Sequence, residues 1–205
     1  MLNRRTFSSA LVLPALAVGV PQASAASVGQ KAPDFTAIDA AGKTHKLSDF
    51  NGKHVVLEWT NPGCPFVVKH YSGNMQALQN EFTAKGVVWL SVNSTSKSAS
   101  DYLEPAKLMA WKADKNSAAT AVLMDESGKI GQLYSAKTTP HMFIINPQGV
   151  LVYAGAIDSI ASARVDDIKT ATNYIRQGLN EAIKGRAIST PSTRAYGCSV
   201  KYKDA

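Results

Sequence analysis

The sequence predicts one α/β domain, a central mixed β-sheet flanked by helices, and three observations support this. Short segments rich in β-branched and aromatic residues alternate with segments of helical periodicity. About 180 residues follow an N-terminal leader, which is the size of a single domain. Two apolar segments near the end are separated only by the Pro-Gln-Gly turn 147–149, which indicates an antiparallel hairpin.

Residues 1–25 have the pattern of a secretory signal peptide. A basic pair precedes a mostly apolar stretch over 10–20, and small residues at 23–25 suit a cleavage site. The apolar stretch is too short, and interrupted by Pro14, for a permanent membrane span, which needs about 20 residues. The string NRRTF resembles the twin-arginine export signal of bacteria, and Sec export is the alternative. Either route predicts an exported, for example periplasmic, protein in an oxidising compartment.

The charge is modestly basic, with 22 basic and 15 acidic residues and a net charge of +7. Loss of the leader removes Arg4 and Arg5 and no acidic residue, which leaves 20 basic against 15 acidic residues and a net charge of +5. The basic residues are scattered and not interleaved with aromatic residues, so no nucleic-acid partner is predicted. No repeat or linker divides the chain. We therefore expect one domain over 26–186 and an extended C-terminal tail over 187–205.

The elements follow in order along the domain. Strands are predicted at 54–60, 86–93, 120–125, 141–146 and 150–156. Helices are predicted at 66–84, 100–113 and 164–184. The first helix rests on apolar residues spaced by three or four, namely Val67, Tyr71, Met75, Leu78 and Phe82. A strand–helix–strand crossover of this length implies that the first two strands are parallel.

Cys64 lies in the turn GCPF, between the first predicted strand and the first predicted helix. A cysteine at a helix N-terminus is favoured as a thiolate, because unpaired N–H groups and the helix dipole stabilise the anion. Pro65 suits the first helical position, where its missing N–H costs nothing. The alternative is a buried, unreactive cysteine.

Three segments together resemble the thioredoxin superfamily, and within it the redoxin branch of the AhpC and TSA relatives. They are the entry segment 28–60, the turn GCPF, and TTPHMFIIN, within a resemblance that spans 28–184. The resemblance implies a thioredoxin-like fold in which Thr139 and Pro140 are joined by a cis peptide bond that faces Cys64. The alternative is a trans proline that begins a strand. Trp59 resembles the tryptophan just upstream of the family's cysteine, so it either shields the thiolate or fills the strand core.

Departures from the family patterns bear on the chemistry. Val67 stands where a thioredoxin has its second cysteine, which excludes a vicinal dithiol. The peroxiredoxin pattern requires Pro at 57 and Thr or Ser at 61, where this chain has Leu57 and Asn61. Thr60, one residue away, and the Asn61 amide are the nearest substitutes. The resemblance therefore favours thiol–disulfide exchange over peroxidase activity.

The second cysteine, Cys198, lies on the tail. If the tail folds back over the sheet end and brings the two Cα atoms within about 7 Å, Cys64 is the attacking thiol and Cys198 a candidate resolving thiol. The alternative is a structural disulfide, which would stabilise the chain by about 4–5 kcal/mol in the chain-entropy model.

Three function classes follow. The first is an exported thiol–disulfide oxidoreductase, whose partners are protein thiols or disulfides and a thiol reductant of the compartment. The second is an atypical peroxidase, which rapid oxidation of Cys64 by peroxide would select. The third is a non-enzymatic module with a disulfide or metal site, which inertness toward peroxide and dithiols would select. No cofactor is predicted.

Other residues near Cys64 carry weaker signals. His70 and His141 are candidate copper or zinc ligands together with Cys64, but the spacing is not that of a metal site, so no metal is predicted. Glu58 and Lys69 flank the cysteine in sequence and either tune its pKa or are simply solvated.

Overall fold

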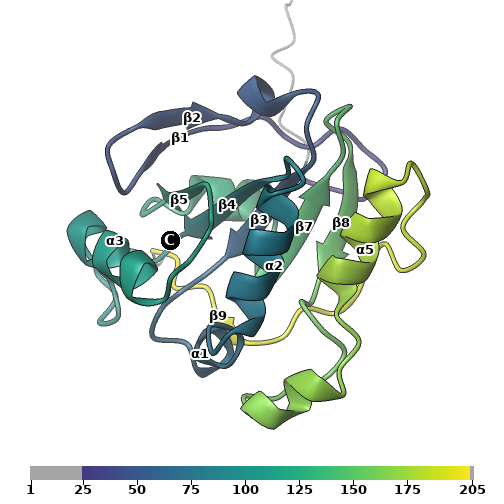
Figure 1. The fold of residues 1–205 in the computed structure, drawn as a ribbon. Helices are drawn as coiled ribbons and strands as arrows, with labels where there is room; N and C mark the ends of the chain where they lie inside the picture. The colour runs from purple at the N-terminus through teal and green to yellow at the C-terminus, as the bar shows by residue number, and fades with distance from the viewer. Residues whose placement is uncertain (1–24, 204–205) are drawn as a thin grey trace, which may run out of the picture.

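A computed structural model describes residues 25–203; apart from Ala25, the predicted signal peptide lies outside them. Seven strands form one mixed sheet (Figure 1), in the order β2 (Thr44–Lys46), β1 (Thr36–Asp39), β5 (Ala121–Met124), β4 (Val88–Asn93), β3 (Val55–Trp59), β7 (His141–Ile145) and β8 (Leu151–Gly155). All residues of β3, β4 and β7 are buried, as expected for central strands.

The five predicted strands are all present, and their pairing agrees with the prediction. β3 is parallel to β4, and β7 and β8 form the predicted antiparallel hairpin. The hairpin β1–β2 was not predicted. Its strands have only four and three residues, too few to show a clear alternation of apolar and polar residues.

The helices differ from the prediction at their ends. They are α1 (Pro65–His70), α2 (Asn74–Thr83), α3 (Pro105–Asp114), α4 (Lys129–Leu133) and α5 (Tyr174–Ile183), with 3-10 turns η1 (Leu47–Phe50) and η2 (Val165–Lys169). The prediction of one helix over 66–84 is wrong, because Gly73 has a φ of +133° and separates α1 from α2. The apolar stripe continues across this break, and its five residues are all buried.

The last predicted helix, 164–184, is also divided. The chain makes the 3-10 turn η2 and then begins α5 after Asn173, whose side-chain oxygen accepts a hydrogen bond from the backbone N–H of Arg176 at 2.9 Å. α3 begins at Pro105 rather than at residue 100, since proline is favoured in the first turn of a helix. The short helix α4 was not predicted.

Two apolar layers cover the two faces of the sheet. One layer packs α1, α2 and α5 against the sheet and contains Cys64; Figure 1 shows α2 and α5 over this face. The other layer contains residues of the N-terminal hairpin and of α4. No helix among residues 25–203 is long and apolar enough to cross a membrane.

The C-terminal tail folds back over the end of the sheet, beside α1 (Figure 1). Its strand β9 (Cys198–Ser199) pairs with β6 (Thr138–Thr139), which directly precedes β7. Cys198 packs against the layer of α1, and Val200 packs against the opposite layer. Farther on, the Tyr202 hydroxyl donates to the carbonyl of Ala136 at 2.7 Å. Residues 198–202 of the tail are therefore docked on the domain.

Candidate active site

The turn before Cys64 is held by Asn61. The side-chain oxygen of Asn61 accepts a hydrogen bond from the N–H of Gly63 at 2.8 Å. The backbone carbonyl of Asn61 accepts one from the N–H of Cys64 at 3.0 Å. Its side-chain amide donates to Thr95 at 3.2 Å and to Asp101 at 2.9 Å. These bonds fix Cys64 as the N-cap residue of α1, with Pro65 in the first turn as predicted.

Cys64 faces the peptide bond between Thr139 and Pro140, which is cis as predicted. The Cys64 thiol donates a hydrogen bond to the Thr139 carbonyl oxygen at 3.0 Å. Only 3% of Cys64 is exposed. The tail and the adjoining loops therefore leave little of Cys64 exposed in this structure.

Cys198 lies opposite Thr139 in the pairing of β9 with β6. Its thiol is within hydrogen-bonding reach of Cys64, and both cysteines are free thiols in this structure. The close approach depends on Gly197, which has a φ of +137° and whose missing Cβ would overlap the Thr139 carbonyl oxygen. The structure therefore brings together two cysteines that are far apart in the sequence.

The two thiols have opposite pKa shifts. Burial raises the pKa of Cys64, but interactions with the Cys198 thiol, the Thr139 side chain and the backbone N–H groups of Val67 and Cys198 outweigh it, so the pKa lies below its ordinary value. Burial and the neighbouring Cys64 raise the pKa of Cys198 to about 11, although Lys201 opposes this. Of the two thiols, Cys64 is therefore the more readily ionised, and the Cys198 thiol is one of the groups that favour its ionised form.

Two buried hydroxyls near this turn, those of Thr60 and Thr139, have no hydrogen-bond partner within the described part of the chain. The Asn61 amide is committed to Thr95 and Asp101. The Thr139 hydroxyl nonetheless lowers the pKa of Cys64, so it is a donor available to a Cys64 thiolate or to a bound oxygen atom.

Trp59 is fully buried in the layer opposite the one that contains Cys64. Its indole N–H donates to the Ser94 hydroxyl at 3.0 Å, and its ring packs edge-on against Phe143 with the ring centres 5.1 Å apart. This position corresponds to the strand-core alternative for Trp59.

Glu58 and Lys69 are buried, so the suggestion that they are solvated is wrong. The Glu58 carboxylate accepts four hydrogen bonds, from Tyr71 at 2.8 Å, Gln79 at 3.2 Å, Trp89 at 2.7 Å and Ser91 at 3.1 Å. Burial raises the pKa of Glu58 more than these donors lower it. A single charged residue in the otherwise apolar strand VVLEW was the sequence signal for such a buried network.

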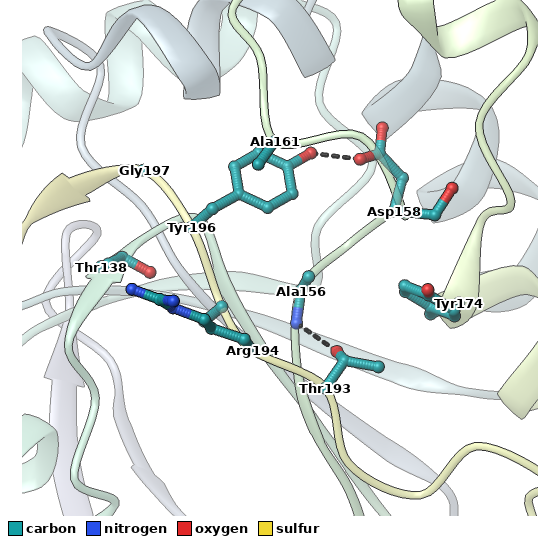
Figure 2. Close-up of a pocket in the computed structure, with 11 residues that line it drawn as sticks. Thr138, Ala156, Asp158, Ala161, Tyr174, Thr193, Arg194, Tyr196 and Gly197 are labelled. Atoms are coloured by element: carbon teal, nitrogen blue, oxygen red, sulfur yellow. Dashed lines mark hydrogen bonds between the residues drawn. The ribbon is translucent and has the colours of Figure 1, made fainter.

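Lys69 instead pairs with Asp158, with 3.3 Å between the ammonium nitrogen and a carboxylate oxygen. Asp158 also accepts a hydrogen bond from the Tyr196 hydroxyl, and Figure 2 shows this contact beside a cavity of about 610 Å³. Sequence reasoning missed Asp158 and Tyr196, because the contact joins a loop after β8 to the distant tail.

The two histidines, His70 and His141, are both buried and hydrogen-bonded. Burial lowers the pKa of both His70 and His141 to about 4, so both rings are neutral at pH 7. His141 accepts the backbone N–H of Lys137 at 3.2 Å, and His70 is bonded to Tyr196 at 3.2 Å. Within residues 25–203, no group of three or more His, Cys, Asp or Glu side chains is arranged to hold a metal ion.

Sequence comparison identifies similar proteins with redox chemistry. The model of the AhpC/TSA family matches residues 28–154. The thiol-disulfide oxidoreductase ResA of Geobacillus kaustophilus is 27% identical over 126 residues, which cover 62% of this chain and 67% of that protein. A Helicobacter pylori protein provisionally named as the peroxiredoxin bcp is 32% identical over 141 residues, covering 60% of this chain and 84% of that protein.

Solved structures show the same fold. A hypothetical protein of Sinorhizobium meliloti superposes with a TM-score of 0.75 at 21% identity, over 89% of this chain and 98% of that one. A protein of Chlorobium tepidum provisionally identified as the thiol:disulfide interchange protein DsbE superposes with a TM-score of 0.50 at 28% identity, over 63% of this chain and 85% of that one. The predicted thioredoxin-like fold is confirmed.

The contact between the thiols predicts how Cys64 titrates. Removal of the Cys198 thiol in Cys198→Ala takes away a donor to the thiolate, so the pKa of Cys64 is expected to rise. Cys198→Ser keeps a hydroxyl donor and should raise it less. Thiolate absorbance or the pH dependence of alkylation measures this. An unchanged or lower Cys64 pKa in Cys198→Ala would show that Cys198 does not stabilise the thiolate.

Proposed function

The chain belongs to the AhpC/TSA family, and we propose that it is an exported thiol–disulfide oxidoreductase in which Cys64 attacks and Cys198 resolves. A redoxin-type thiol oxidoreductase activity agrees with its similarity to ResA and to the DsbE-like protein. The observation that carries the more specific proposal is the pairing of Cys198 with Thr139, directly beside Cys64.

The reaction is a pair of disulfide exchanges. The Cys64 thiolate attacks one sulfur of a substrate disulfide, which forms a mixed disulfide and releases the other substrate sulfur as a thiolate. Cys198 then loses its proton to that thiolate or to water and attacks Cys64 Sγ. The Cys64–Cys198 disulfide forms, the second substrate thiolate leaves, and two electrons have passed to the substrate.

The unequal pKa values support this assignment of roles. Cys64 is the thiol with the lowered pKa, and Cys198, with a pKa of about 11, is held back as a thiol until the mixed disulfide removes the negative charge beside it. Pro140 and Thr139 contribute by presenting the Thr139 carbonyl to Cys64 and its backbone to the resolving strand. A thiol reductant of the compartment would return the disulfide to the dithiol.

A peroxidase is the second candidate, favoured by the similarity to the bcp protein and by the unpartnered Thr139 hydroxyl. In that reaction the Cys64 thiolate attacks a peroxide oxygen, an alcohol or water leaves, and Cys198 condenses with the sulfenic acid to give the same disulfide and water. This chain has Leu57 and Asn61 where the peroxiredoxin pattern has Pro and Thr or Ser, which favours the thiol–disulfide oxidoreductase over the peroxidase.

Trapping distinguishes these candidates. Cys198→Ser is expected to stop after one turnover on a peptide disulfide and to accumulate a mixed disulfide at Cys64, detectable by mass spectrometry. Cys64→Ser should abolish peptide reduction, and the exposed Ser127→Ala serves as a control outside the two cysteines. Fast sulfenic acid formation with peroxide, together with no mixed disulfide, would instead select the peroxidase. Inertness in both assays would contradict either activity and select a binding module.

Export is supported by the pattern of residues 1–25. Expression of the full chain in a bacterium is expected to yield a periplasmic protein that begins at Ala26, as measured by fractionation and N-terminal sequencing. Replacement of both Arg4 and Arg5 by lysine should block export if the twin-arginine route is used and leave it unchanged if Sec is used. A full-length protein retained in the cytoplasm would contradict export.

A further inference from the structure

A buried polar cluster holds the tail just before Cys198. The cluster consists of Lys69 and His70 from α1, Asp158 from the loop after β8, and Tyr196 from the tail. Figure 2 shows the Tyr196 hydroxyl directed at the Asp158 carboxylate. Lys69, His70 and Asp158 are each at most 3% exposed, so their hydrogen bonds are not replaced by water.

The hydrogen bonds of this cluster determine one arrangement of Tyr196. The Asn74 amide donates to His70 Nδ1 at 2.8 Å, so the proton of the neutral ring lies on Nε2. His70 Nε2 therefore donates to the Tyr196 hydroxyl at 3.2 Å, and that hydroxyl donates to Asp158. Asp158 is in turn paired with Lys69 at 3.3 Å. The Tyr196 hydroxyl therefore accepts one hydrogen bond, from His70, and donates one, to Asp158.

The same cluster links the two cysteines. Phe66 lies two residues after Cys64 and Tyr196 two residues before Cys198, and their rings pack edge-on with centres 5.7 Å apart. Lys69 also lies 5.7 Å from the centre of the Tyr196 ring. The helix α1, whose N-cap is Cys64, therefore contacts the tail two residues before Cys198 and holds it close to Cys64.

Packing alone does not hold this part of the tail. A cavity of about 610 Å³ lies on one side, lined by Arg194, Tyr196 and Gly197. A second cavity of about 530 Å³ is lined by Thr193, Arg194 and Ala195. Beside this open space, polar bonds position residues 193–197: Thr193 accepts the Ala156 N–H at 2.9 Å at one end, and the Tyr196 hydroxyl bonds nearest to Cys198 at the other.

We propose that Tyr196, bonded to Asp158 and His70 and packed on Phe66, is a positioning residue that sets the effective concentration of Cys198 at Cys64. This proposal rests on the proposed function and adds the residue that makes the resolving step fast. Tyr196 does not touch the substrate; it acts through the backbone that carries Cys198. The resolving step needs no further reactant, because Cys198 and the mixed disulfide supply both sulfurs and both electrons.

The first test is Tyr196→Phe, which removes only the hydroxyl, with Tyr102→Phe as the control. Tyr102 also donates to a carboxylate, that of Glu126, at 2.8 Å, but it lies outside the cluster. The equilibrium constant for forming the Cys64–Cys198 disulfide with oxidised glutathione is measured. Tyr196→Phe should lower it about tenfold, the size expected for a lost hydrogen bond to a charged group. Tyr102→Phe should leave it unchanged.

The second readout separates positioning from general disruption. Tyr196→Phe is expected to raise the pKa of Cys64 when Cys198 is present and to leave it unchanged in a Cys198→Ala background. A purely structural role would move the pKa in both backgrounds or in neither. Phe66→Leu removes the ring contact and keeps an apolar side chain. Like Tyr196→Phe, it should lower the equilibrium constant for the disulfide and raise the pKa of Cys64 when Cys198 is present. Asp158→Asn is a poor test, since it leaves the Lys69 ammonium buried without its counter-charge.

The outcomes also separate this inference from the proposed function. If the wild-type protein forms no Cys64–Cys198 disulfide with glutathione, the proposed function itself fails. If the wild type forms that disulfide and Tyr196→Phe matches Tyr102→Phe in both readouts, the positioning role of Tyr196 is overturned and the proposed function stands.

Discussion

The pairing of Thr139 with Cys198 is the contact on which the site depends. Thr139 presents its carbonyl to Cys64 and its backbone to the tail, so one residue places both cysteines. The chain has no second cysteine in the turn at Cys64, and the tail supplies one from the far end of the sequence. Gly197 permits this approach, because any Cβ there would overlap the Thr139 carbonyl oxygen.

Close contact between two thiols in a partly buried site makes them unequal. The pKa of Cys64, at the N-terminus of α1, lies below its ordinary value, whereas that of Cys198 is raised to about 11, so Cys64 is the thiol that ionises first. In the proposed function Cys198, with its raised pKa, is the hydrogen-bond donor to the Cys64 thiolate. The cluster around Asp158 and Tyr196 then keeps the donor in place, in a part of the tail that lies beside open cavities.

The sequence was sufficient for the fold and for the position of Cys64 at the N-terminus of α1, because these depend on local patterns. A few neighbouring residues are enough to recognise each of these patterns: the strand segments, the turn GCPF and the Thr139–Pro140 pair. Helix ends were less predictable: the apolar stripe over 66–84 continues through the break at Gly73, so its period gives no sign of the break. Asp158 and Tyr196 were missed because their roles arise from tertiary contacts between distant segments.

The central claim is that Cys64 and Cys198 form a working redox couple, and a redox-buffer titration of the mature protein tests it most directly. Samples are alkylated at each potential and their peptides mapped by mass spectrometry. The account predicts a single two-electron transition that links Cys64 to Cys198 at a potential above about −300 mV. A bridge that opens only in denaturant, or a Cys64 that reacts with neither oxidants nor alkylating reagents in the folded protein, would contradict it.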